Sequence, residues 1–420
     1  MPGISRLSYA ARSFLQLAVF SCAVAACGTD SNGFVGPSGD GAPSAEPNEA
    51  PNGAPEKEAS FPKIPSGKYK KSANIVAVVT PGSTVSTPAG KVSLATKISE
   101  FLDVLASGVW WKTVSAEYDL GEVAGHRVVT GGPWEGPANE DSMTAYIRDA
   151  IDGPPDQNSV YILYLPEGVF EDESVFLDGS CIYDGRHSSR SGLVWGMVQR
   201  CGAAEAWLDE FDELTYASSH EIIESITDPV PPSGIVIPVD DETPWNGSAW
   251  GWGGGENADL CNGTQVLEKG FYFTRVYSNS AAEAGGDPCI PAVSAPYFNV
   301  RSPKEWYAVT PGGSVDIPLT GWSTDTLPSW RLFAYGSLDE DLVGPHHQVL
   351  QLNSILIDNI DVNTREAPIS SGKSVTMRVT APSDSKSGAF NVIQVISLLN
   401  TRYDELSGRL HQWQIGIYVP

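Results

Sequence analysis

Residues 214–229 read LTYASSHEIIESITDP, and this stretch sets the fold of the first half of the chain. Its three isoleucines provide an apolar side that can anchor a helix in a core. The pattern predicts a helix that begins near residue 203, is interrupted near Asp212 and ends before Pro229, because proline disfavours the helical conformation of the residue before it.

The same helix carries the chemistry. His220 and Glu224 are four residues apart, so both side chains leave one face about one turn apart. Glu221 follows His220 and is rotated by about 100°. In the HExxH pattern two side chains at this spacing bind zinc, and the glutamate after the first ligand is the general base. Here Glu224 stands where the second histidine would be, and a third protein ligand is needed.

The surrounding blocks resemble one protein family. SSHEIIESITDP at 218–229, ENADLCN at 256–262 and FYFTRVYSNSA at 271–281 are similar to SHELxExxTDP, ENADxC and a strand that ends in W/Y-S-N. These blocks occur in a family of secreted bacterial proteins that is regarded as zincin-like metallopeptidases. Plant phosphate-induced (exordium-like) proteins look similar over the same blocks. CIYDGRHSS at 181–189 resembles a further segment of the family. The connection at 230–255 departs from it, since it is longer and richer in Trp and Gly.

The resemblance implies an α+β zincin-like fold over residues 73–300, a bound Zn²⁺ and a peptidase activity. Residue by residue, the match carries His220, Glu221, Glu224, Thr227, Asp228, Pro229, Glu256, Asp259 and Cys261.

Four residues are open as the third metal ligand. Glu256 is preferred because it follows Glu224 by 32 residues, a separation like that in gluzincins. Asp259 is the next choice, and whichever of the two acids does not ligate is expected to orient the histidine. His187, in a loop, and Asp228, eight residues after His220, are the remaining candidates.

A site with one histidine and two carboxylates has a physical consequence. Two negative ligands nearly neutralise a dication, so its bound water is less acidic than in a three-histidine site. Oxygen-rich ligation also discriminates weakly against Mn²⁺ and Ca²⁺. The sequence therefore supports a metal site more firmly than fast peptide hydrolysis.

The folded region is expected to contain two domains. Residues 73–300 mix strands at 74–79 and 159–165 with helices at 92–107 and 142–151. Residues 301–420 contain about seven strands with period-two alternation, which predicts an immunoglobulin-like β-sandwich. These strand candidates are Val315/Ile317/Leu319, WRLFAY, QVLQL, SILIDN, Val375/Met377/Val379, FNVIQVISLL and Trp413/Ile415/Ile417/Val419.

The N-terminus predicts export. Residues 1–27 combine two arginines, a short apolar run and the end Val24-Ala25-Ala26-Cys27, which resembles a bacterial lipobox with Cys27 as the lipidation site. An ordinary cleavage site, and so a secreted soluble protein, is the alternative. Residues 28–72 are poor in large apolar side chains and are expected to form a tether without fixed structure. The expected location is the bacterial cell envelope, at the outer membrane or the surface.

Four cysteines remain after the leader, and an even number in an exported chain favours two disulfides. Three connectivities exist. Pairing of neighbours, Cys181–Cys201 and Cys261–Cys289, is preferred because each pair closes a short loop.

Composition limits the partners. The chain has 26 basic and 51 acidic residues, a formal charge of -25, which argues against nucleic acid. No apolar run is long enough to span a bilayer, so a membrane is expected only through the lipid anchor. A peptide or protein is the expected substrate. The tryptophans of the 230–255 loop leave a glycan open, although a packed, Gly-rich loop is the preferred explanation.

Two functions follow from these observations. The first is a lipid-anchored zinc-dependent hydrolase of peptides in which Glu221 takes a proton from the metal-bound water. The second is a non-catalytic surface binding or adhesion module that keeps the zincin scaffold.

Overall fold

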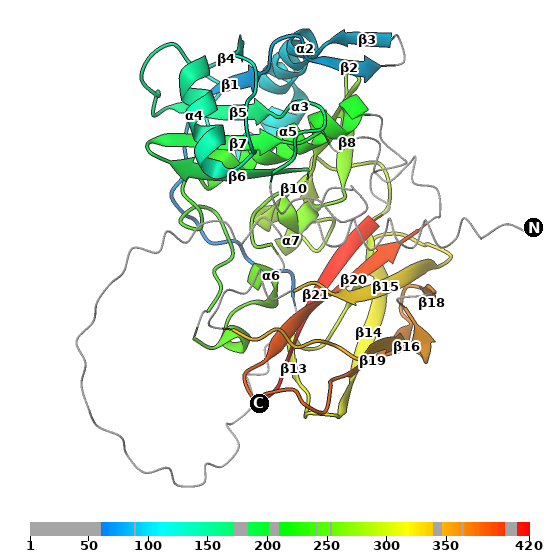
Figure 1. The fold of residues 1–420 in the computed structure, drawn as a ribbon. Coiled ribbons are helices and arrows are strands. Elements are labelled where there is room, and N and C mark those ends of the chain that lie inside the picture. Colours follow the sequence, from blue (N-terminus) through cyan, green and yellow to red (C-terminus); the bar gives the residue numbers. More distant parts are fainter. Residues whose placement is uncertain are drawn as a thin grey trace, which may run out of the picture.

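The computed structural model describes residues 60–87, 90–171, 184–200, 210–240, 242–252, 254–338, 347–362, 365–399 and 410–420. The leader with Cys27, the expected tether up to residue 59 and the Cys181–Cys201 pair lie outside these ranges. Figure 1 shows two parts, a helix-covered sheet built from the first half of the chain and a pair of sheets built from the second half.

The first part is built on a five-stranded mixed sheet in the order β4-β1-β5-β7-β6. Four strands are parallel, and β6 at the edge is antiparallel to β7. The central strands are almost continuously apolar and buried, as expected for strands covered on both faces. The strand bounds are β1 Asn74–Val79, β4 Gly125–Thr130, β5 Ser159–Tyr164, β6 Gly185–Arg190 and β7 Leu193–Val198.

A two-residue turn joins β6 to β7. Ser191 and Gly192 both have positive φ, 53° and 82°. Such a turn matches the twist of an antiparallel hairpin and fixes its register. His187 on β6 consequently pairs with Gly196 on β7.

Helices cover both faces of this sheet. α4 (Glu140–Ala150) packs Met143 and Ile147 against one set of alternating strand residues, while α2 (Leu94–Ser107), α3 (Val109–Tyr118) and α5 (Glu210–Thr227) join the core on the other face. Their ends are capped locally. Asn139 and Ser142 form a capping box for α4, and the Glu268 carboxylate accepts hydrogen bonds from the first two amides of α3.

Short elements complete the first part. The hairpin β2 (Thr84–Thr87) and β3 (Gly90–Ser93) precedes α2, and β8 (Gln265–Glu268) with β9 (Phe271–Thr274) follows the candidate site. The remaining pieces are η2 Pro244–Asn246, α6 Ala249–Trp252, η3 Asp259–Cys261, β10 Val276–Tyr277, α7 Asn279–Glu283 and β11 Cys289–Ile290.

Several local predictions are confirmed. The strand at 74–79 is β1, SVYILYL contains β5, and the helices at 92–107 and 142–151 are α2 and α4 with slightly different ends. α5 ends at Thr227, shortly before Pro229, as expected. Its predicted first part, residues 203–209, lies outside the described residues.

The second part is a β-sandwich of two five-stranded sheets, so the prediction of a sandwich is confirmed. The sheets have the orders β12-β14-β19-β16-β17 and β13-β21-β20-β15-β18. Ten described strands replace the expected seven or so, and QVLQL forms only an isolated bridge at Val349. The bounds are β12 Phe298–Arg301, β13 Trp306–Ala308, β14 Ser314–Ser323, β15 Trp330–Gly336, β16 Ser354–Ile357, β17 Ile360–Asp361, β18 Ala367–Ile369, β19 Ser374–Thr380, β20 Phe390–Leu398 and β21 Leu410–Tyr418.

The expected tether needs a correction at its end. Residues 60–72 pack on both parts of the fold, because Phe61 and Ile64 give this segment apolar surface to bury. The Phe61 ring lies 5.5 Å from that of Trp413 in the sandwich, and Ile64 is 3% exposed. The Lys70 amide donates to the carbonyl of Ile226 near the end of α5 at 2.9 Å.

The Trp-rich loop joins the two parts. Trp245 stacks on Tyr418 with ring centroids 4.5 Å apart, Trp252 lies 4.8 Å from Phe390, and Trp250 lies 5.6 Å from Trp413. These rings are packed against sandwich strands. Trp250 and Trp252 are buried and Trp245 is partly buried, as the packed-loop interpretation expects.

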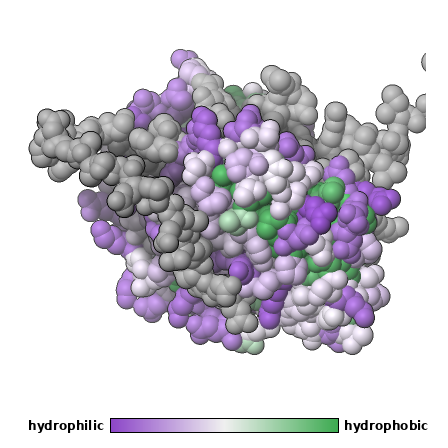
Figure 2. Space-filling view, turned by 90° about the horizontal axis from the view of Figure 1, so that it is seen from below, coloured by the Kyte–Doolittle hydropathy of each residue, from purple (hydrophilic) through white to green (hydrophobic). Residues whose placement is uncertain are grey.

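The surface shown in Figure 2 is mostly hydrophilic or neutral, with apolar residues in separate small areas among polar ones. The large apolar side chains that the described residues expose most are Val109, Val230, Val239 and Leu267, which come from different elements. Single exposed apolar side chains of this kind are normal on a folded protein.

Candidate metal centre

α5 is held in the centre of the first part. It contacts β6, β7 and β9, and almost all of its residues are buried. Two serines preceding His220 fix its position, since Ser218 shares a 2.8 Å hydrogen bond with the Tyr164 hydroxyl and Ser219 accepts one from the Thr274 amide, also at 2.8 Å. His220, Glu221 and Glu224 are thus carried on a helix that has little freedom to move.

Two glycines let α5 approach the edge of the sheet. A Cβ at Gly196 of β7 would lie 3.0 Å from Cβ of Glu221, and a Cβ at Gly185 of β6 would lie 2.7 Å from its Oε1. Both positions need the small side of glycine because Glu221 occupies the space. The Glu221 side chain is consequently enclosed between α5 and the hairpin.

The first convergent group is His220, Glu224 and Asp259. His220 Nε2 lies 3.1 Å from Glu224 Oε1 and 3.3 Å from Asp259 Oδ1. The three side chains are 8%, 0% and 1% exposed, and both carboxylates have oxygens without a hydrogen-bond partner. One imidazole nitrogen and two carboxylate oxygens within 4.8 Å of one another can hold a divalent cation.

His187 brings a second imidazole to the site from β6. Its Nδ1 lies 3.6 Å from Glu224 Oε2 and 3.9 Å from Glu221 Oε2. Its Nε2 lies 3.1 Å from the backbone oxygen of Asp228 and 3.6 Å from Glu256 Oε1. The sequence suggested a loop position for His187, but the residue is on a strand, because β6 pairs with β7 through the two-residue turn.

Glu256 and Asp228 group with His187 rather than with His220. Asp228 Oδ1 accepts a hydrogen bond from the Gly234 amide at 2.8 Å, so this residue also shapes the turn that follows α5. Asp259, the second choice for the third ligand, lies beside His220 and Glu224, where Glu256 was the first choice. The candidate residues His187, His220, Glu221, Glu224, Asp228, Glu256 and Asp259 therefore all meet in one buried region.

Contacts from three directions position Asp259. It begins η3, and the Cys261–Cys289 disulfide, predicted from the spacing and confirmed, joins that turn to β11. Gln412 of β21 donates from Nε2 to the Asp259 carbonyl at 2.9 Å. The neighbouring Asn257 donates to the Thr227 hydroxyl at 3.1 Å, which ties the turn to the end of α5. The sandwich thus takes part in placing a candidate ligand.

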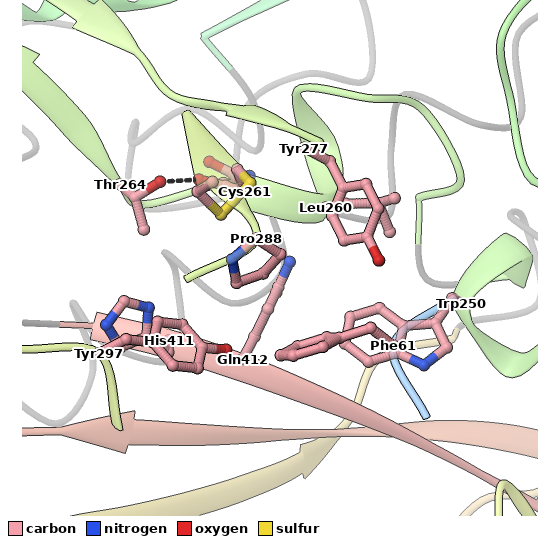
Figure 3. A pocket seen from close by; sticks show the side chains of 12 residues that line it. Phe61, Trp250, Leu260, Cys261, Thr264, Tyr277, Pro288, Tyr297, His411 and Gln412 are labelled. Carbon is pink, nitrogen blue, oxygen red and sulfur yellow. Dashed lines mark hydrogen bonds between the residues drawn. A yellow bond between two sulfur atoms is a disulfide. The ribbon is translucent and has the colours of Figure 1, made fainter. Parts of the chain in front are cut away.

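Figure 3 shows the residues around a pocket between the sandwich strand that carries Gln412 and the loop that carries Cys261. A cavity of about 10 Å³, at the lower limit of what can hold a single water, lies between Trp250, the Cys261–Cys289 region and His411. Gln412 points from its strand toward the loop that carries Cys261. The cavity is too small for a substrate. It lies where the first part of the fold contacts the sandwich.

Burial and mutual charge shift the pKa values of the site. Burial opposes the charged form of His220, but the Glu224 carboxylate and then Asp259 outweigh it and raise the pKa of His220 well above its usual value. Burial is also the main cause that raises the pKa of Asp259 to about 7 and the pKa of Glu221 and Glu256 well above the usual range. Without a cation, the site contains an ion pair surrounded by acids that favour their protonated form.

Sequence reasoning missed two acids near this group. Asp184, three residues before His187, is hydrogen-bonded to Glu213, and burial raises its pKa to about 6 while the charge of His220 lowers it. Glu213 lies seven residues before His220, so the helical period that paired His220 with Glu224 also points to it. No comparable local signal exists for Asp184.

Comparisons with known proteins assign no family. No family model and no curated protein matches the chain. A conjugative transposon lipoprotein from Bacteroides eggerthii is 11% identical over 30% of this chain and 98% of its own, with a TM-score of 0.20. A lipoprotein from Bacteroides thetaiotaomicron is 10% identical over 31% and 86%, with a TM-score of 0.21. Domains 4 and 5 of the S-layer protein SbsC are 11% identical over 32% and 59%, with a TM-score of 0.19.

These similarities identify neither a family nor a function for the chain. Within the described residues, no helix combines the length and apolar character needed to cross a membrane.

Proposed function

We propose that the chain is a zinc-dependent hydrolase of the bacterial cell envelope, with a zincin-like first domain and a peptide or protein as substrate. His220, Glu224 and Asp259 are the proposed ligands of the cation. The observation that carries the proposal is the convergence of His220 Nε2, Glu224 Oε1 and Asp259 Oδ1 at 3.1–3.3 Å in a buried site where both acceptor oxygens lack hydrogen bonds.

The donor set suits a divalent cation. In a tetrahedral zinc site with bonds of about 2.1 Å, neighbouring ligand atoms are about 3.4 Å apart, close to both distances. Zn²⁺ is the proposed ion, and the two carboxylates leave Mn²⁺ and Ca²⁺ as alternatives. A bound cation of this kind lowers the pKa of a coordinated water and polarises a carbonyl oxygen.

Glu221 is the proposed proton acceptor. It follows His220 on α5 and leaves the helix from a different side than His220 and Glu224. Its carboxylate is nevertheless buried beside the three ligands, and the charge of His220 acts on it. A carboxylate held in this way can take a proton from an attacking water and pass it to a leaving amine. Burial, which raises the pKa of Glu221, makes it a stronger base than an exposed carboxylate.

The rest of the chain supports a role outside the cytoplasm in this proposal. Lipidation at Cys27 would hold the fold at the outer membrane or cell surface. The Cys261–Cys289 disulfide is compatible with an oxidising compartment. The sandwich would then position the site through Gln412 and space it from the membrane.

Metal analysis followed by peptide hydrolysis tests the proposal. Purified full chain is expected to contain zinc. His220→Ala and Glu224→Ala are expected to lose the zinc of this site, whereas His126→Ala keeps it. His126 is the matched control because its ring is paired with Asp103 on α2 and is not part of the site. Glu221→Gln is expected to abolish cleavage of a peptide library while a cation remains bound at His220.

Each result has a defined meaning. An unchanged zinc content in His220→Ala would contradict the proposed ligands. Zinc bound at His220 without cleavage of any peptide in the library would contradict the hydrolase and favour the binding or adhesion module.

A further inference from the structure

We propose that a second divalent cation binds beside the first, held by His187, Glu221 and Glu224, with the Glu224 carboxylate bridging the two ions. The first ion is that of the proposed function, on which this inference rests. The second site uses an imidazole from the sheet edge, and nothing in the helix pattern alone points to it.

The hydrogen bonds of His187 define which ring nitrogen is available. Nε2 lies 3.1 Å from the backbone oxygen of Asp228, and a carbonyl oxygen can only accept, so Nε2 carries the proton. Nδ1 is then a bare lone pair. Metal-binding histidines commonly donate their other nitrogen to a carbonyl in this manner, which fixes both tautomer and ring orientation.

The bare nitrogen points at oxygens that also lack partners. Nδ1 of His187, Oε2 of Glu221 and Oε2 of Glu224 are buried, and none has a hydrogen bond. The three side chains are 1%, 3% and 0% exposed. A lone pair that faces two carboxylates repels them, and an unpartnered buried polar atom is costly. A cation between the three atoms removes both costs.

The distances fit this interpretation. Nδ1 lies 3.6 Å from Glu224 Oε2 and 3.9 Å from Glu221 Oε2. Ligand atoms around a tetrahedral cation are about 3.4 Å apart, and slightly longer separations suit larger or more highly coordinated ions. Small side-chain movements therefore suffice to close this second site.

Glu224 can serve both ions because its two oxygens face different histidines. Oε1 lies 3.1 Å from His220 Nε2, and Oε2 lies 3.6 Å from His187 Nδ1. Neither oxygen has a hydrogen-bond partner, although the side chain is completely buried. This is the geometry of a carboxylate that bridges two metals.

The number of buried carboxylates also favours a second cation. Five carboxylates of this region are at most 5% exposed, those of Glu221, Glu224, Asp228, Glu256 and Asp259. When all five are ionised, one dication offsets two of their five negative charges, whereas two dications offset four. Buried charges are tolerated when they are paired or coordinate a metal.

His187 also groups with Asp228 and Glu256, on the Nε2 side. Binding there would require the Nε2 proton to leave its hydrogen bond with the Asp228 carbonyl. The Nδ1 side needs no such change, and all three of its ligand atoms are without partners. We therefore assign the second ion to the Nδ1 side.

The second ion changes the role of one residue. When only the first site is filled, Glu221 is free to accept a proton, and when both are filled, Glu221 is a ligand of the second ion. Glu221→Gln therefore reports on both proposals, through catalysis in the one-ion form and through metal content in the two-ion form.

Zinc and manganese titrations of the full chain test the inference. Chelator-treated protein is loaded with Zn²⁺ and its metal content measured after desalting. We expect two equivalents in the unsubstituted chain and in His126→Ala, but one in His187→Ala. Loading with Mn²⁺ is expected to give an electron paramagnetic resonance spectrum of two coupled ions, which becomes that of an isolated ion in His187→Ala.

The outcomes separate this inference from the proposed function. A single zinc that stays in His187→Ala and leaves in His220→Ala overturns the second site and keeps the first. Two zinc ions that both stay in His187→Ala also overturn it, while a chain that binds no zinc overturns both proposals. If His187→Ala does not fold, the manganese spectrum of the unsubstituted chain decides, since uncoupled ions alone contradict a bridge.

Discussion

Gly196→Ala tests how closely α5 must approach the sheet for the site to form. The added Cβ would lie 3.0 Å from Cβ of Glu221 and 3.2 Å from Cδ1 of Ile162. Both neighbours are buried, one on α5 and the other on β5. The methyl group therefore has to push the helix away from the hairpin or distort β7.

The expected cost is that of overpacking a core. Extra methylene-sized groups in a packed interior cost about 1–3 kcal/mol. With a urea m-value of about 2 kcal/mol/M, this lowers the unfolding midpoint by about 0.5–1.5 M. Zinc affinity is expected to fall as well, because α5 carries His220 and Glu224 while β6, next to β7, carries His187.

Gly132→Ala is the matched control, since a Cβ there meets nothing within 4 Å and the residue has no positive φ. Its effect on stability should stay within about 0.5 kcal/mol. The two variants are compared by urea unfolding after chelation and by zinc titration. Equal midpoints and equal zinc affinities in the two variants would refute the close approach of α5 to the hairpin.

Three further predictions concern the support of Asp259. Burial raises its pKa to about 7, so in chelated protein the folded chain keeps a proton that the unfolded chain loses above about pH 4. That contribution to stability is complete below pH 4 and disappears as the pH rises through 7. The urea midpoints at pH 5 and pH 8 should therefore differ less in Asp259→Asn than in the unsubstituted chain. Gln412→Ala removes one of the two donors to the buried Asp259 carbonyl, which keeps the Asn262 amide at 3.0 Å. The loss should cost about 0.5–1.5 kcal/mol, against no change for the exposed Gln348→Ala, as urea unfolding would show. Replacing Cys261 and Cys289 by serine opens a loop with a separation of 28 residues, and calorimetry should show a loss of about 3–4 kcal/mol together with weaker zinc binding.

The parts of the site that could be predicted from the sequence are those that depend on the spacing of residues within one helix or strand. His220 and Glu224 had to share a face once the segment was helical, and they lie 3.1 Å apart. The central strands were visible because a strand covered on both faces is apolar along its whole length.

The parts that sequence did not predict depend on pairing between distant segments. His187 reaches the site only because β6 is antiparallel to β7 and aligned by a two-residue turn. The choice between Glu256 and Asp259 depends on η3, on the disulfide and on Gln412 in the sandwich, none of which is encoded in the spacing from Glu224. The end of the tether was also misjudged, because two apolar residues, Phe61 and Ile64, suffice to pack that segment.

The most direct measurement of the central claim is a crystal structure of the zinc-loaded full chain with anomalous data at the zinc edge. We predict a peak within about 2.0–2.2 Å of His220 Nε2 and of one oxygen each from Glu224 and Asp259. An absence of anomalous density among these three side chains in crystals that contain zinc elsewhere, or a His220 ring turned away from both carboxylates, would contradict it.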